Sequence, residues 1–258
     1  MREALHAEWT KLHTVAGTGW LVLNTVVLTV ALGSAVAATV RCPTGGCDQD
    51  PVRLSLTGIH LGQAVVAILA VLVIGGEYST GMIGTTLVAV PRRATVLAAK
   101  AVVLVSVVVG AGTVAVLGSV LAGRLLLPGN GFVPANGQVV VSLADGPTLR
   151  AAVGSVLYLA LVALLSLGVA TAVREPAIAI GVVLGLLYLF PIVTQVVSDP
   201  DWERRLQRLA PMTAGLAVQA TTDLGGLPIG PWKGLGVLAF WAASALLVGG
   251  LVLHRRDA

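Results

Sequence analysis

Long apolar runs, separated by short polar segments, dominate the pattern along this chain. A helix rises about 1.5 Å per residue and a bilayer core is about 30 Å thick, so about 20 apolar residues suffice for a span. The runs are continuous rather than alternating, which argues against a membrane β-barrel. The pattern therefore predicts an all-α integral membrane protein, one transmembrane domain over residues 1–258 with six transmembrane helices. The expected spans are residues 17–40, 56–76, 96–126, 149–173, 177–197 and 234–253.

Composition supports this prediction and narrows the possible partners. The chain is 56% hydrophobic and only 11% charged, whereas about 25% of a soluble domain is charged. Its net charge of +4 comes from basic residues scattered at the span ends, so we expect no nucleic-acid partner. We expect the chain to be surrounded by membrane lipid. Tryptophans near span ends are typical of the membrane interface, and the five in this chain are Trp9, Trp20, Trp202, Trp232 and Trp241.

Two segments outside the spans are predicted to form short helices. Residues 1–15 place Leu5, Trp9 and Leu12 on one side of a helix and charged residues such as Glu8 elsewhere, which predicts an interfacial helix in the headgroup plane. A plain membrane anchor is the alternative. Residues 198–232 combine a charged amphipathic half with an apolar half too short to span. We expect two short extracytoplasmic helices there, with an ordinary surface loop as the alternative.

The stretch between the second and third runs reads GEYSTGMIGTTLVAVPRR over residues 76–93. Pro91 blocks continuation of a helix, and Arg92 and Arg93 stand where the next span begins. One interpretation is a membrane loop whose arginines bind headgroups, and the other is a helix that docks on a soluble partner. Spacings of three and four predict a short helix with one apolar side, formed by Met82, Ile83, Thr86, Leu87 and Val90.

These residues also carry a resemblance to a known family. An acidic residue at the end of the second span, then Tyr-Ser-Thr-Gly-Met-Ile, Thr-Thr-Leu and Val-Pro-Arg-Arg, with Lys100 early in the next span, resembles the membrane subunit of type 2 ABC exporters. The likeness covers the whole chain in span count and loop order, but its specific motifs lie in the first ~100 residues. Gly84 departs from the pattern, because many relatives carry a basic residue there. The resemblance implies a cytoplasmic coupling helix over residues 77–93, with coupling residues Glu77, Tyr78, Thr80, Gly81, Met82, Ile83, Thr86, Leu87, Arg92 and Arg93.

The same resemblance implies a function and partners. The chain would be the permease subunit of an ATP-driven exporter of a drug, peptide, lipid or ion. It would act as a dimer with a second permease copy or paralogue, together with a separate cytoplasmic ABC ATPase subunit. Arg174 and Glu175 would form a second cytoplasmic turn near that ATPase, and residues 198–232 an outer lid. The interfacial helix would also touch the ATPase, through Leu5, Glu8, Trp9 and Leu12.

Two rival functions remain. An ATP-independent secondary carrier is expected to place ionisable residues at mid-membrane, and the clear span interiors lack them. A non-transporting membrane scaffold or immunity protein is the other rival.

Motifs for chemistry within the chain are missing. The sequence has no G-x-x-x-x-G-K-[ST] motif, so we expect ATP and Mg²⁺ in the partner subunit and no cofactor or enzymatic activity here. The four histidines lie near span ends without metal-ligand spacing, and no metal site is predicted.

The cysteines and the positive charges bear on orientation. Cys42 and Cys47 share a short loop after the first span, and a disulfide between them requires the oxidising side of the membrane. Free thiols and a metal site are the alternatives. With termini inside, eight basic residues fall on each side, so the positive-inside rule does not decide. The cysteine loop and the resemblance favour a multi-pass protein of the cell membrane with both termini cytoplasmic.

Overall fold

The computed structural model of the protein describes residues 2–14, 16–42, 49–89, 92–132, 141–196 and 199–255. Within these ranges the chain is helical and contains no strand. The helices, in chain order, are α1 (Arg2–Thr14), α2 (Ala16–Thr39), α3 (Pro51–Ser55), α4 (Ile59–Ser79), α5 (Met82–Ala89), α6 (Arg93–Leu126), η1 (Pro128–Asn130), α7 (Gly146–Val173), α8 (Pro176–Val196), α9 (Pro200–Leu209), α10 (Pro211–Leu216), η2 (Ala217–Gln219) and α11 (Pro231–Arg255).

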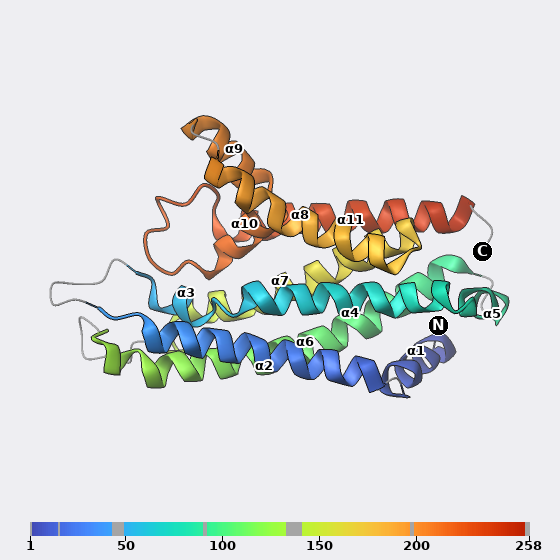
Figure 1. The fold of residues 1–258 in the computed structure, drawn as a ribbon, viewed down its shortest axis with the longest axis horizontal. Helices are drawn as coiled ribbons and strands as arrows, with labels where there is room; N and C mark the ends of the chain where they lie inside the picture. Colours follow the sequence, from blue (N-terminus) through green and yellow to red (C-terminus); the bar gives the residue numbers. More distant parts are fainter. Residues whose placement is uncertain are drawn as a thin grey trace.

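Six of the described helices are long and apolar enough to cross a membrane: α2, α4, α6, α7, α8 and α11. They form an elongated bundle, with both chain ends, α1 and α5 at one end and α3 at the other (Figure 1). We call the first the terminal end and the second the opposite end. The prediction of an all-α chain with six span-length helices is confirmed.

Helix α7 is the central helix of the bundle. It packs against α4, α6, α8 and α11, and 61% of its most apolar window is buried, against 22% for α2, α8 and α11. The outer helices expose large apolar side chains, such as Phe240 on α11, which is 73% exposed. Lipid tails are as apolar as these side chains, so such exposure costs nothing in a bilayer.

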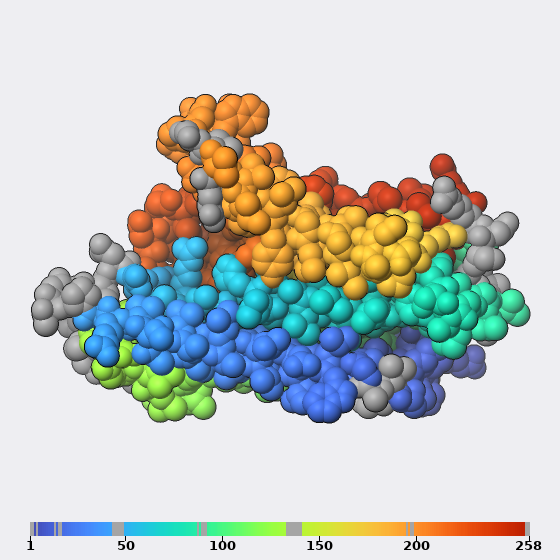
Figure 2. All heavy atoms as spheres, viewed as in Figure 1, coloured from blue at the N-terminus to red at the C-terminus, as the bar shows by residue number. Residues whose placement is uncertain are grey.

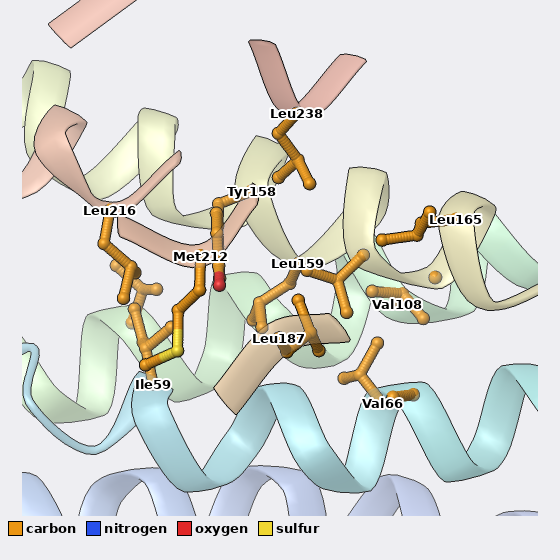
Figure 3. Close-up of a cluster of buried hydrophobic side chains, with 14 of the residues drawn as sticks. Ile59, Val66, Val108, Tyr158, Leu159, Leu165, Leu187, Met212, Leu216 and Leu238 are labelled. Atoms are coloured by element: carbon orange, nitrogen blue, oxygen red, sulfur yellow. The ribbon is translucent and has the colours of Figure 1, made fainter. Parts of the chain in front are cut away.

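The chain before the last span enters the bundle. Helix α9 has no buried residue and projects from the surface (Figure 2). In contrast, nearly all of residues 210–220 are buried. Met212 and Leu216 of α10 join a cluster with Ile59, Tyr158 and Leu238 from α4, α7 and α11 (Figure 3).

Glycines make room for this buried segment. A Cβ on Gly234 of α11 would lie 1.9 Å from the carbonyl oxygen of Ala214, and one on Gly154 of α7 would lie 2.2 Å from Val218. Both distances are far below van der Waals contact, so only glycine allows α10 and η2 to approach this closely.

The boundaries of the span-length helices differ from the sequence-based expectation by up to three residues. Helix α4 continues to Ser79, because Gly81, with φ of 72°, provides the left-handed residue that ends it. The predicted coupling stretch 77–93 is therefore divided: Glu77 and Tyr78 belong to α4, α5 begins at Met82, and Arg93 opens α6. The pattern also gave no indication of α3, whose first turn is capped by the Asp50 carboxylate.

Candidate functional site

Four charged side chains meet at the terminal end of the bundle. Glu8 and Lys11 come from α1, Glu77 from the last turn of α4 and Lys100 from the early part of α6. The four side chains meet because three helices, α1, α4 and α6, converge at this end. We refer to Glu8, Lys11, Glu77 and Lys100 as the ion network.

Lys100 lies at its centre, and its side chain is 1% exposed. Its Nζ lies 2.7 Å from Glu8 Oε2 and 2.8 Å from Glu77 Oε1. Lys11 Nζ lies 2.6 Å from the same Glu77 Oε1 and 3.2 Å from Glu8 Oε1. Two carboxylates and two ammonium groups thus alternate in space and their formal charges cancel.

The network joins elements far apart in sequence. Lys11 also donates a hydrogen bond of 3.3 Å to Thr86 Oγ1, which brings α5 into contact with α1. A buried ion pair contributes little net stability, but removing one partner leaves an uncompensated charge and costs about 3–5 kcal/mol. The network therefore opposes the separation of α1, α4 and α6. The hydrogen bond from Lys11 to Thr86 links α5 to the edge of the network.

Lys11 lies on α1, outside the span-length helices. Burial lowers the pKa of its ammonium, but hydrogen bonding to Glu77 and the charges of Glu8 and Glu77 outweigh this effect. The pKa of Lys11 is consequently raised above its ordinary value. Lys11 is therefore a cation at physiological pH, and its attraction to the two carboxylates is lost only in strongly alkaline solution.

Helix α5 presents a different side to solvent than its apolar pattern indicates. Ile83 is buried at 5% exposure, whereas Met82 is 45% and Val88 85% exposed, and Thr85 between them is also exposed. Within the predicted apolar stripe, Ile83 thus packs on the protein's own bundle, whereas Met82 is exposed. The side chain of Leu87 lies outside the described part of the chain, as do Val90 and Pro91. Among the described side chains of α5, the exposed ones are Met82, Thr85 and Val88.

Other predicted residues lie around this end. Thr80, Gly81 and Arg92 are exposed. On α1, Glu8 is the buried residue at 5% exposure, while Trp9 is 46% exposed and Leu5 and Leu12 are partly buried. The side of α1 that meets the bundle is therefore centred on a carboxylate rather than on its apolar stripe.

Two arginines hold the end of α11. Arg93 Nη1 donates to the carbonyl oxygen of Leu253 at 2.5 Å, and Arg174 Nη2 donates to that of Val252 at 3.2 Å. Cations favour a helix C-terminus, where carbonyl groups lack intrahelical partners. Arg174 also lies over the Tyr78 ring, 5.5 Å from its centroid. Both the predicted coupling stretch and the predicted second turn thus contact the last turn of α11.

Glu175 has a local role. Its Oε2 accepts a hydrogen bond of 2.5 Å from the Ile178 amide, which caps the first turn of α8.

At the opposite end, Asp50 joins two distant segments. Its carboxylate accepts from the hydroxyl of Thr221 at 2.7 Å and the amide of Thr222 at 3.1 Å, besides capping α3. Cys42 nearby is disulfide-bonded. Cys47, its predicted partner, lies outside the described residues.

Sequence reasoning did not assign Lys11 or Lys100 to the site. Lys100 did carry a signal, since a lysine seven residues into a span-length apolar helix is costly unless paired. Lys11 carried none, because a charged residue on a short amphipathic helix is ordinary. In the described ranges, no group of three or more His, Cys, Asp or Glu side chains is placed to hold a metal ion.

The comparisons with known proteins assign no family to this site. No model of a protein family matches the chain, and no curated protein matches its sequence.

Proposed function

We propose that this chain is the permease subunit of an ATP-driven exporter with the organisation of type 2 ABC transporters. It lies in the cell membrane with both termini cytoplasmic, pairs with a second copy or paralogue, and binds a cytoplasmic ABC ATPase subunit that holds ATP and Mg²⁺. The observation that carries the proposal is α5. This eight-residue helix lies between two span-length helices, with an exposed outer surface and an inner side attached to the ion network.

The attachment explains how movement of a partner reaches the spans. A force on Met82 and Val88 moves α5 against α4, because Ile83 packs inward and only Thr80 and Gly81 separate the two helices. The ion network then resists separation of α4 from α1 and α6, so these helices move together. Packed elements joined in this way switch between discrete arrangements rather than deform continuously. The nucleotide state of the partner would select between two such arrangements.

Other features support the orientation. With the terminal end cytoplasmic, α1 and the Arg174–Glu175 turn lie on the ATPase side. Asp50, α9 and the disulfide-bonded Cys42 then lie on the outer side. The ion network lies near one end of the bundle, as Lys100 is only about 10 Å along α6 from its start. An ion-coupled carrier would be expected to bury such groups near mid-membrane instead.

The experiment is a double substitution on the outer surface of α5, Met82→Asp with Val88→Asp. Both side chains are exposed, so insertion and folding should be unaffected. Losing two apolar contacts of about 1.5–3 kcal/mol each predicts at least a hundredfold weaker binding of the proposed ABC ATPase subunit. Co-purification from detergent and ATPase-dependent export are the measurements.

The matched control is Leu224→Asp with Gly225→Asp at the opposite end. Leu224 is 44% exposed, close to Met82, and a Cβ on Gly225 meets nothing within 4 Å. The control should retain ATPase binding. If the α5 variant retained normal co-purification and export, the proposed function would lose its support.

A further inference from the structure

A groove of about 370 Å³ lies between the start of α6 and the end of α11. Its volume is in the range of ligand sites. On the α6 side it is lined by Ala94, Ala98 and Ala101, whose spacing places them on one face of the helix, and α11 contributes Gly250. These side chains are too small to fill the space between the two helices, which leaves the groove open.

The groove extends from the end of the bundle towards its middle. From Arg93 to Ala101, its lining on α6 covers eight residue steps, which is roughly 12 Å along a helix axis. Both helices are of span length, and this part of each lies at the terminal end (Figure 1). Leu247 and Leu251 of the lining are 68% and 57% exposed, so the groove opens to the surface where acyl chains pack.

The outer end of the groove carries positive charge. Arg93 and His254 line it there, and the hydrogen bond from Arg93 Nη1 to the carbonyl oxygen of Leu253 holds the guanidinium at this end. Arg92 and Arg255 are the chain neighbours of these two lining residues, and both are exposed. None of the described residues that line the groove is acidic. The ion network at the same end is neutral, so it does not offset these cations.

Charge and shape together select the ligand. An acyl chain suits the apolar length of the groove, and an anionic headgroup suits the arginines at its end. Guanidinium groups bind phosphate through charge-assisted and often bidentate hydrogen bonds. A zwitterionic lipid would bring an ammonium group to the same cations, which offsets the attraction of its phosphate. Basic pockets between transmembrane helices bind anionic lipid headgroups for this reason.

We propose that the groove between α6 and α11 is a binding site for an anionic phospholipid of the phosphatidylglycerol class. The phosphate lies at Arg93, with Arg92 and Arg255 adding to the positive charge around it. One acyl chain packs along Ala98 and Ala101 of α6 and Gly250 of α11. The site requires no ATPase partner, so its test is independent of the proposed function.

The test uses the purified full chain in detergent and native mass spectrometry with added lipid. Delipidated protein should bind phosphatidylglycerol at least tenfold more tightly than phosphatidylcholine or phosphatidylethanolamine of the same chains. The double variant Arg92→Gln with Arg255→Gln should reduce this preference at least threefold. Arg205→Gln with Lys233→Gln is the matched control, because it also removes two exposed cations but on α9 and at the start of α11. The control should keep the full preference.

A second pair of variants fills the groove without changing its charge. Ala98→Phe and, separately, Gly250→Leu should abolish the preference for phosphatidylglycerol, because both residues line the groove. A Cβ on Gly250 would lie 3.7 Å from Leu97, an ordinary contact, so the backbone tolerates a side chain there. Gly110→Phe is the control on α6, since its Cβ meets nothing within 4 Å and it does not line the groove.

Three results would overturn the proposal. Equal binding of phosphatidylglycerol and phosphatidylcholine would remove the role of the arginines. Equal losses in the double variant and its charge control would show that attraction to the lipid is not localised at this groove. Unchanged preference in both filling variants, with the folded state verified by circular dichroism, would place the lipid elsewhere, and loss of a dimer in those variants would make the groove an interface between copies.

Discussion

Replacing Lys100 with methionine tests the ion network most directly. Methionine fills a similar volume without charge, so the main change is electrostatic. The variant leaves Glu8 and Glu77 facing a single cation, Lys11, in a site where the lysine side chain was 1% exposed and the carboxylates 6%. We expect the free energy of unfolding to fall by about 3–5 kcal/mol, the usual cost of removing one partner from a buried pair.

An independent limit gives a similar magnitude. The uncompensated site can relieve itself when one carboxylate binds a proton. At pH 7, protonating a carboxyl group that has the reference glutamate pKa costs about 3.7 kcal/mol. The penalty should therefore shrink as the pH falls from 7 towards 4.5, since protonation then becomes cheaper. Adding Glu8→Gln to the lysine variant should recover part of the loss at pH 7, because one carboxylate and one ammonium again balance.

The assay is urea unfolding in mixed micelles, followed by tryptophan fluorescence at pH 7 and pH 5. Lys233→Met is the control, because Lys233 is exposed and an exposed substitution usually changes stability by less than about 0.5 kcal/mol. A Lys100 variant within 1 kcal/mol of wild type, or a double variant no more stable than the single one, would refute the reasoning.

Three further predictions concern the remainder of the fold. Gly234→Ala should lower the free energy of unfolding by at least about 2 kcal/mol, because its Cβ would meet the Ala214 carbonyl. Gly236→Ala on the same helix is the control, and it should be neutral or stabilising because its Cβ meets nothing within 4 Å. The same urea assay compares the two variants. Cysteines introduced at Arg205 and at Thr222, both exposed, should react with a membrane-impermeant reagent added outside cells, and labelling of Thr222→Cys only from the cytoplasm would contradict the outer location of this segment. Mass spectrometry of unreduced peptides should find Cys42 linked to Cys47, and a Cys42 thiol available to alkylation would exclude the bridge.

The span-length helices were predictable because their cause is local. A chain segment in lipid must satisfy its own backbone groups, so about 20 continuous apolar residues imply a helix whatever surrounds them. Boundaries were less certain, as the continuation of α4 to Ser79 shows. There a glycine at position 76 was compatible with a helix, and the one at position 81, with its positive φ, ended it.

The surface of α5 shows where pattern alone misleads. Met82, Ile83 and Thr86 have helical spacing, but an apolar stripe on a short helix does not reveal whether it meets the same chain or another. The structure places Ile83 inward and Met82 and Val88 outward. In the same way, the apolar half of residues 198–232 was recognised as too short to span, but its insertion between α7 and α11 depends on glycines of those two helices.

The sequence by itself determined that this chain is helical, that six helices can span a membrane, and that a short helix follows the second of them, since each of these depends on neighbouring residues. Only the tertiary structure decided that Glu8, Lys11, Glu77 and Lys100 form one network. The contacting residues are 66 and 92 positions apart in the chain, and no local pattern relates them. Burying a charge is strongly unfavourable unless an opposite charge is buried beside it. Whether that happens depends on how α1, α4 and α6 pack together.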